Sequence, residues 1–578
     1  MIVRTLQIAA KSLATQQQGM DTVSHNIANV NTDGYSRQSA NLVTAPSDQM
    51  GLFSFGNGVQ LDSISRSMDP LIARAQVANN SQASFANTLK EGLSSVEATF
   101  GNLGVPGLTS TLDAFFNAQQ LLANSPDDPI ARTGMVARAN DIANLASSMQ
   151  QQLVARQQSA NLEVGTLINS VNTTLDNIAD LNTQILKKES GGQAGSQAND
   201  LRDRRDIEVL KLAKFIPVQQ VSTNDGGLLL QTPGGDLLVQ GGYARDLKVG
   251  TAAGSSFDVV QFSDNGMTAT GIGSGGRIGG LMTIRDTQLA DYVSTLDSLA
   301  RNLIFSVNQQ HAGGTGTTAV TSYTSGLAPA NAAAPVNADP DIPFAAKIVD
   351  GSFTIHVLDS DPPTNPGGTA VNITAATTSL NDIVAAIGAT AGTGIAGVSA
   401  SVNASGALVI DGGANRVVFS NDSSNFLAAY EINTFFSGSG AADITVDAAI
   451  LSDAGRIATA TADATTSAVA INDNSLALSI FALRDQALNV DGGTPASLTE
   501  RATNLAGSFG MDIAAATRDS IFRESEATTL SLQRDSVSGV NLDEEMINMM
   551  TFQRSYEAAA KVIQTANQML TSLMGLIR

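Results

Sequence analysis

Apolar residues recur at alternating steps of four and three along both ends of the chain. Near the N-terminus this step runs through residues 2–30, where eight of its nine positions are apolar. Near the C-terminus it runs through residues 542–577, where nine of its eleven positions are apolar. A repeat of 3.5 residues that lasts for four or more heptads is typical of a coiled-coil seam. The pattern therefore predicts a long amphipathic helix at each end.

The bulky side chains of these two stripes form a predicted assembly interface. A free helix of this length exposes an apolar stripe of about 45 Å to water, and amphipathic helices draw most of their stability from packing. We therefore expect the terminal helices to pair with each other and with neighbouring subunits. An ordinary helix pair that closes a globular domain is the alternative. The interface residues are Ile2, Leu6, Leu13, Met20, Val23, Ile27, Val30, Leu542, Met546, Met549, Tyr556, Ile563, Leu570, Met574 and Ile577.

Polar residues refine the prediction for both helices. Gln16, Gln553 and Asn567 occupy positions on the two seams, where buried polar groups sometimes fix the register of paired helices. Asn541 precedes the C-terminal helix as a capping residue. The acidic residues 543–545 follow it in the first turn, where the helix dipole favours negative charge.

Further elements are predicted between the two ends. The helical patterns cover residues 70–100, 107–123, 131–189, about 280–311 and 496–537. The β-like patterns cover the extended segment 35–66, the stretch 215–262, and strands near 353–358, 371–374, 398–402 and 408–410, with a short helix at 380–387.

These elements predict a multidomain α+β protein, in which a terminal α-helical coiled coil and a long-helix bundle carry inserted β-rich domains. Residues 315–345 are rich in Ala, Gly, Thr and Pro, and we expect a linker there. The predicted domains are a terminal helical assembly domain (1–36 with 538–578), a long-helix body (37–214, 277–314 and 455–537, with the extended segment 35–66), a β-rich middle domain (215–276), the linker (315–345) and an inserted outer β-rich domain (346–454).

The net charge of the chain restricts the kinds of molecule that it is expected to bind. The formal net charge is −21, whereas binding to nucleic acid needs Lys and Arg against the phosphates. We therefore expect no nucleic-acid partner. Residues 1–36 are neutral overall and residues 538–578 nearly so. Near-neutral ends around an acidic middle suit termini that are buried in an assembly and a body that is solvated.

Several other features restrict the reactive groups of the chain, its relation to membranes and the way in which it can leave the cell. The chain has no cysteine, which excludes disulfides, thiolate metal sites and cysteine nucleophiles. No run of 18 apolar residues occurs, so we expect no insertion into a membrane. The first residues lack the apolar core and cleavage site of a secretory signal peptide. If the protein leaves the cell, we expect another route.

Three features of the sequence resemble catalytic or ligand-binding sites, but their context does not support such a role. Residues 271–276 match the glycine pattern of dinucleotide-binding proteins, but no βαβ unit surrounds them, so a flexible start of the following helix is the better interpretation. His25, His311 and His356 show no metal-ligand spacing. The Asp and Arg residues at 200–206 indicate a charged helix start with local ion pairs. We expect no catalytic residue, cofactor or metal.

The segment Ser24–Gln38 carries the most specific motif in the chain. Its core, Asn-Ile-Ala-Asn followed by Asn-Thr-x-Gly-Tyr, resembles the N-terminal signature of bacterial flagellar axial proteins, and the continuation Tyr-Ser-Arg-Gln resembles the hook-filament junction proteins among them. The motif residues are Asn26, Asn29, Asn31, Gly34, Tyr35, Ser36, Arg37 and Gln38.

Other segments extend this resemblance. Residues 540–556 are similar to the junction proteins, and 558–570 to hook and rod proteins more widely. Residues 199–206, 279–286 and 425–436 resemble the inner region of the junction proteins. Glu431 departs from that pattern, because the family more often has Gly there.

The resemblance implies an extracellular, non-catalytic ring between the hook and the filament of the flagellum. It also implies export without a cleavable signal peptide, through the type III channel of the flagellum. The implied partners are further copies of the chain, neighbouring hook and second junction proteins, and a cytoplasmic export chaperone on the C-terminal helix.

Two other functions remain open at this point. One is another flagellar axial protein, such as a hook or rod subunit. The other is an adhesin-like surface protein that acts through the insert at 346–454. Aromatic residues make up only 4 % of the chain, which argues against a glycan-binding surface.

Overall fold

The computed structural model describes most of the chain, and its residues fall into two compact units. The described residues are 2–50, 53–101, 107–190, 198–222, 227–252, 254–360, 363, 365–388, 394–470 and 472–576. The first unit consists of Met1–Leu93, Gln158–Asp286 and Ile513–Arg578, and the second of Ser94–Gln157 and Thr287–Asp512. Each unit therefore combines segments that are far apart in sequence. The five-part division predicted from the sequence stays a prediction, except at 315–345.

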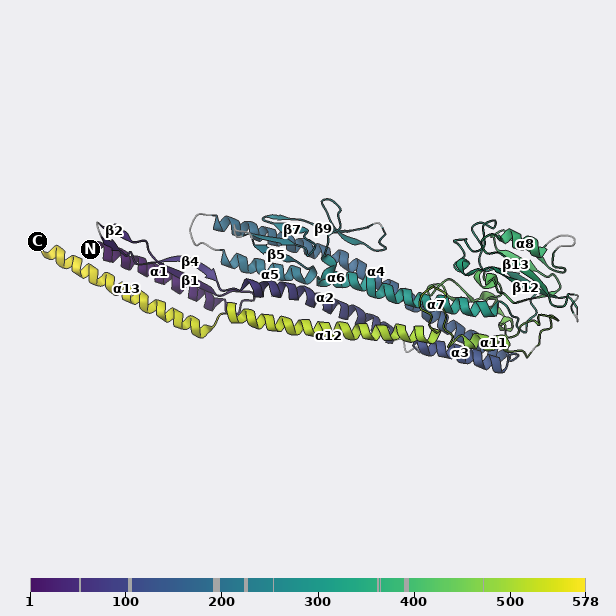
Figure 1. Cartoon of the computed structure of the whole chain (residues 1–578). Coiled ribbons are helices and arrows are strands. Elements are labelled where there is room, and N and C mark those ends of the chain that lie inside the picture. Colours follow the sequence, from purple (N-terminus) through teal and green to yellow (C-terminus); the bar gives the residue numbers. More distant parts are fainter. Residues whose placement is uncertain are drawn as a thin grey trace. The chain divides into compact units, whose positions relative to one another are not determined.

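Long helices form the frame of the first unit. The N-terminal helix α1 (Ile2–Ala28) and the C-terminal helix α13 (Leu542–Leu576) lie side by side (Figure 1). Helices α2 (Pro70–Gly101), α4 (Pro129–Glu189) and α12 (Leu498–Ser538) have residues in both units, and α5 (Asn199–Phe215) and α6 (Gly276–Thr283) belong to the first. The helices predicted at 70–100, 131–189 and 496–537 are confirmed. No helix among the described residues is both long enough and apolar enough to span a bilayer.

Local sequence signals account for the ends of these helices. Ser497 and Glu500 form a capping box at the start of α12, in which each side chain accepts a hydrogen bond from the backbone N–H of the other residue. Asn541 Oδ1 accepts from the N–H of Asp543 and caps α13, as predicted. The break at 539–541 therefore separates α12 from α13.

Short antiparallel strands complete the first unit. β1 (Gln38–Thr44) pairs with β4 (Val59–Arg66), and β2 (Asp48–Met50) pairs with β3 (Phe53–Phe55), which confirms the extended segment. β5 (Gln219–Ser222), β6 (Leu228–Gln231), β7 (Leu237–Gln240) and β8 (Tyr243–Ala244) form a four-stranded sheet in chain order, and β9 (Leu247–Gly250) pairs with β10 (Val259–Phe262).

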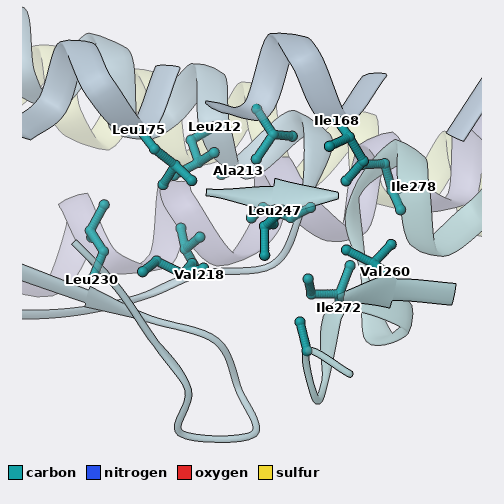
Figure 2. Close-up of a cluster of buried hydrophobic side chains, with 14 of the residues drawn as sticks. Ile168, Leu175, Leu212, Ala213, Val218, Leu230, Leu247, Val260, Ile272 and Ile278 are labelled. Carbon is teal, nitrogen blue, oxygen red and sulfur yellow. The ribbon is translucent and has the colours of Figure 1, made fainter. Parts of the chain in front are cut away.

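The core of the first unit lies between helices α4 and α5 and these strands. Figure 2 shows Ile168 and Leu175 of α4 in one cluster with Leu230 of β6 and Val260 of β10. Each such side chain, once fully buried, contributes about 1.5–3 kcal/mol to stability. The strands predicted at 215–262 are therefore held on the helices by a shared apolar layer.

The second unit combines helices with two three-stranded sheets. Its helices include α3 (Leu108–Asn124), α7 (Leu289–His311), α8 (Leu380–Gly388), α9 (Phe426–Ala429), α10 (Ala448–Ser452) and α11 (Ser475–Ala482). One sheet has the order β13 (Thr369–Ile373), β12 (Gly351–Leu358), β16 (Arg416–Ser420), and the other β11 (Ser322–Thr324), β15 (Leu408–Asp411), β14 (Ser399–Val402). A two-stranded pair of β17 (Phe436–Ser437) and β18 (Thr445–Val446) follows α9.

The linker predicted at 315–345 is wrong. Its residues 322–324 form β11, which pairs with β15 of the outer sheet. Val336 is fully buried. Phe344 is 3 % exposed, and the centroid of its ring lies 5.2 Å from that of Phe305 of α7. The few apolar residues of this segment have no regular spacing, so their burial could not be seen in the pattern. They pack into the second unit all the same, because the folded chain places an apolar surface beside them.

Candidate assembly interface

The pairing of α1 with α13 is the structural basis of the candidate interface. On α1 the most deeply buried positions form one line, and most of them are small: Ala9, Thr15, Gly19, Thr22, Val23 and Asn26. On α13 the buried positions are Glu545, Ala559 and Ala566. Gly19 faces the ring of Phe552 so closely that an added Cβ atom would lie 2.5 Å from it. Small residues thus let the two helices approach each other closely.

The buried line of α1 includes Ala9 and Val23 of the predicted stripe, and its other positions lie one residue before that stripe. Thr15, Gly19, Thr22 and Asn26 face inward, whereas Gln16, Met20 and Ile27 are half-buried. The bulky residues therefore flank the contact instead of filling it. An apolar periodicity detects the bulky side chains, and it cannot detect the contact that Gly19 makes with Phe552.

The predicted seam residues consequently differ in exposure. Val23 is buried, and the half-buried residues are Ile2, Leu6, Leu13, Met20, Ile27, Val30, Met549, Ile563 and Leu570. The exposed residues are Leu542, Met546, Tyr556 and Met574. Ile577 lies outside the described residues. Several bulky positions are thus left without a covering partner in the single chain.

Asn26, at the C-terminal end of α1, forms hydrogen bonds through both the nitrogen and the oxygen of its side-chain amide. Its Nδ2 donates to the carbonyl of Gln38 at 2.8 Å and to Glu545 Oε2 at 2.9 Å. Its Oδ1 accepts from the Tyr35 hydroxyl at 2.7 Å and from the N–H of Gln38 at 2.9 Å. One side chain therefore joins α1, the motif loop and α13, and any other residue at this position would leave buried groups unpaired.

Glu545 is the buried partner of Asn26 on α13. Its carboxylate is 1 % exposed and also accepts from Arg37 Nε at 2.9 Å. Arg37 Nη1 also binds Oε2 of the exposed Glu544 at 2.9 Å. A buried carboxylate is costly unless it is paired and hydrogen-bonded, and here both conditions hold. The motif loop and α13 are thus fixed to each other by charge-assisted hydrogen bonds.

Tyr35 and His25 close the same network. The Tyr35 hydroxyl has a single proton, which it gives to Asn26, so His25 Nδ1, at 3.0 Å, donates to that oxygen. Burial, followed by the nearby carboxylates of Asp200, Asp203 and Glu545, raises the pKa of Tyr35 well above its usual range. The hydroxyl therefore stays protonated and remains a donor. His25 therefore supports the turn of the motif.

Gly34 makes the turn of the motif possible. Its φ is +76°, in the left-handed region that glycine favours. An added Cβ atom would also lie 2.5 Å from Ile207 of α5. Asn29 secures the start of this turn, since its Nδ2 donates to the carbonyl of His25 at 2.9 Å, while Asn31 is exposed.

The end of the motif is anchored on α5. The N–H of Ser36 donates to Asp203 Oδ2 at 3.1 Å, and Gln38 Nε2 donates to Asp200 Oδ1 at 2.9 Å. Arg66 of β4 binds Asp203 at 2.6 Å, and both side chains are 7 % exposed.

The interpretation of residues 200–206 as a helix start with local ion pairs is therefore wrong in part. Asp203 and Asp206 bind Arg66, which is distant in sequence. The spacing of charges along one helix does not show which distant cation folds back onto it.

Helix α12 also contributes to the network. Arg534 donates to the carbonyl of Tyr35 at 3.0 Å, and the carbonyl of Ser538 accepts from the N–H of Arg37 at 2.9 Å. Sequence reasoning missed the roles of Arg66, Asp203, Arg534 and Glu545. Glu545 lies within the segment 540–556 that resembles the junction proteins, and this was the signal for its role. Its acidic character was explained by the helix dipole alone.

The hydrogen bonds of this network fix α1, the motif loop, α5 and α13 to one another. Its amides, carboxylates and guanidinium groups are occupied by one another. Among the described residues, no group of three or more His, Asp or Glu side chains is arranged to hold a metal ion.

Comparison with known families gives a consistent result along the chain. Residues 93–322 match the helical domain of the flagellar hook-associated protein FlgK. Residues 6–35 match the flagella basal body rod protein, and residues 533–576 match the C-terminal part of the flagellar basal body rod FlgEFG protein. The matches therefore include both terminal helices.

Whole-chain relatives agree with these segments. Flagellar hook-associated protein 1 of Salmonella typhimurium is 29 % identical over 98 % of this chain and 99 % of the relative. The protein of the same name from Escherichia coli K12 is 27 % identical over 98 % of each. A solved structure, the flagellar hook junction protein FlgK from Burkholderia pseudomallei, covers 80 % of this chain and 100 % of its own, with 17 % identity and a TM-score of 0.45.

Proposed function

Because this chain belongs to the flagellar hook-associated protein 1 family and is a structural subunit of the flagellum, we propose that it forms the junction ring between hook and filament. Its paired terminal helices make the contacts within that ring. The observation that carries this proposal is that α1 and α13 bury small residues against each other while bulky apolar residues on α13 stay uncovered. Burial of that apolar surface between subunits supplies the driving force.

The partners follow from the same surfaces. Copies of the chain contact each other through α1 and α13, and the faces above and below the ring contact hook proteins and the second junction protein. The chain leaves the cell through the type III channel of the flagellum, without a cleavable signal. Before export, a cytoplasmic chaperone covers α13, because exposed Met and Ile side chains otherwise promote aggregation. The protein performs no catalysis.

Deletion and replacement in the source bacterium test the proposal. Cells that lack the chain are expected to build hooks, to carry no attached filaments and to release filament protein into the medium. The full chain is expected to restore attached filaments. A chain without residues 1–33 and 538–578 is expected to leave them absent, because the paired helices are gone. Filaments that remain attached in the deletion strain contradict the junction role.

A further inference from the structure

The two ends of α13 carry surfaces of complementary kind. Near its start, Leu542, Met546 and Met550 form an exposed apolar ridge, with exposed fractions of 46, 57 and 48 %. Positions 542, 546 and 550 are four residues apart, so they lie along one face of the helix. Asp543 is exposed beside them and forms no salt bridge among the described residues. The ridge is therefore apolar with an acidic border.

Near its other end, α13 borders an apolar groove. The groove has a volume of about 290 Å³ and lies between the start of α1 and the C-terminal half of α13. Ile2 contributes from α1, and Val562, Ala566 and Met569 contribute from α13. Lys561 stands at the groove, exposed, and likewise forms no salt bridge within the described part of the chain. The groove is therefore apolar with a basic border.

We propose that the Leu542–Met550 ridge of one copy occupies the α1–α13 groove of the next copy, with Asp543 set against Lys561. This inference rests on the proposed function and names the contact by which copies associate. The opposite charges at the two borders favour this occupant over another apolar partner. Ridge and groove both belong to the paired terminal helices, so the contact continues the surface that the pairing leaves open.

Helix geometry makes the contact directional. Met546 and Val562 are separated by about 24 Å along the helix and by about 160° around it. The donor face and the acceptor face of one copy thus lie on nearly opposite sides of α13. One copy cannot satisfy its own groove, and a two-fold pair would leave ridges and grooves unmatched. A head-to-tail contact of this kind generates a ring or a helical array.

Disulfide trapping in assembled flagella tests the proposal, because the chain has no cysteine of its own. The variant Met546→Cys with Val562→Cys is expected to give a ladder of covalent multimers on oxidation. Each copy would then link to two neighbours. A disulfide within one copy is excluded, since it needs Cα atoms within about 7 Å. Each single variant is expected to stay monomeric. A control pair, Leu162→Cys with Val562→Cys, uses another exposed residue and is expected to give no ladder.

The outcomes separate this contact from the proposed function. Attached filaments without a ladder overturn the contact and leave the junction role standing. Covalent dimers from either single variant also overturn it, because they indicate a two-fold contact. Failure of the unmodified chain to restore filaments in the deletion strain overturns the junction role itself.

Charge exchange gives a second test that does not depend on cysteine. Lys561→Glu is expected to reduce the number of attached filaments several-fold, because two like charges then face each other. Adding Asp543→Lys in the same chain is expected to recover most of that loss. Lack of recovery, with both variants normally folded by circular dichroism, contradicts the proposed pairing of these two residues.

Discussion

Glu545 accepts a hydrogen bond from Asn26 Nδ2 at 2.9 Å and so connects two residues that are 519 positions apart in sequence. Both side chains are 1 % exposed. An apolar seam that repeats every seven residues permits neighbouring registers, because a shift by one heptad preserves the pattern. A single buried polar pair does not permit such a shift, since both groups would lose their partners. This pair therefore sets the register of α13 on α1.

Replacement of the buried carboxylate tests this role. Glu545→Gln removes the charge that Arg37 binds and presents an amide where two donors now point. We expect a loss of about 1.5–3 kcal/mol in the stability of the terminal pair, the range for hydrogen bonds to charged groups. Hydrogen exchange of the amides in α1 and α13 measures the loss.

The neighbouring carboxylate supplies a matched control. Glu544 binds the same Arg37, but its side chain is 55 % exposed. Exposed ion pairs contribute about 0–1 kcal/mol, so Glu544→Gln is expected to change exchange rates little. Equal effects of the two variants would show that burial of Glu545 does not matter.

Gly34→Ala is expected to destabilise the motif turn. The substitution incurs the left-handed backbone cost of about 1–2 kcal/mol and also places a Cβ atom 2.5 Å from Ile207. Gly235→Ala is the control, because Gly235 has φ +88° and open space around it. It incurs the backbone cost alone. Chemical denaturation is expected to show a larger loss for Gly34→Ala, and equal losses contradict the contact with Ile207.

Gly19→Ala and Gly507→Ala are expected to have opposite effects, although both replace a glycine inside a helix. Alanine is favoured there by about 0.5–1 kcal/mol. Gly507 of α12 has open space, so its variant gains stability. At Gly19 the new Cβ atom meets the Phe552 ring, so α1 and α13 must separate slightly. Faster hydrogen exchange in α1 and α13 of Gly19→Ala alone is the expected result.

Glu431 makes the stability of the second unit decrease as the pH rises through about 7. Its φ of +52° places its backbone in the left-handed region. Burial, together with Asp447 and Asp443, raises the pKa of its carboxyl to about 7 against the weaker effect of a hydrogen bond from Gly438.

The raised pKa fixes the direction of this effect. The folded state holds the proton more tightly than the unfolded state, so the contribution is complete below about pH 4.5 and is lost as the pH rises through about 7. Glu431→Gln is expected to remove up to about 3 kcal/mol of this pH dependence. Denaturation midpoints between pH 5 and pH 8 measure it, with the exposed Glu97→Gln as the control.

His311 makes the stability of the second unit decrease as the pH falls, which is the opposite direction. Burial, and the positive charge of Arg132, lower the pKa of this imidazole to about 4, although Asn433 opposes the shift. The neutral ring bridges Asn433 and Ala458: Nδ1 donates to the carbonyl of Asn433, and Nε2 accepts from the N–H of Ala458.

A lowered histidine pKa means that the unfolded chain takes up the proton first. Stability is therefore lost as the pH falls from about 6.5 toward 4. His311→Gln is expected to be less stable than the parent at pH 7 and to lose less on acidification. His25→Gln, outside this unit, is the control. An identical acid response in His311→Gln and the parent would contradict this assignment.

The long helices and the motif at residues 24–38 could be predicted from the order of residues along the chain. Apolar periodicity is a local property, and a run of four heptads specifies a helix whatever it packs against. The bounds of α1 and α13 accordingly agree with the predicted stripes. Asn541 was also predictable, because a helix cap depends only on residues within one turn.

Tertiary structure alone decided which faces of these helices meet and which polar residues are buried between them. On α1 the close contact with α13 is made at Gly19, which faces the ring of Phe552 and carries no hydrophobic signal. The burial of Glu545 depends on Asn26 and Arg37, which fold back from the other end of the chain. A buried charge requires hydrogen-bonding or oppositely charged partners in the folded chain. The residue pattern along α13 does not indicate which residues these partners are.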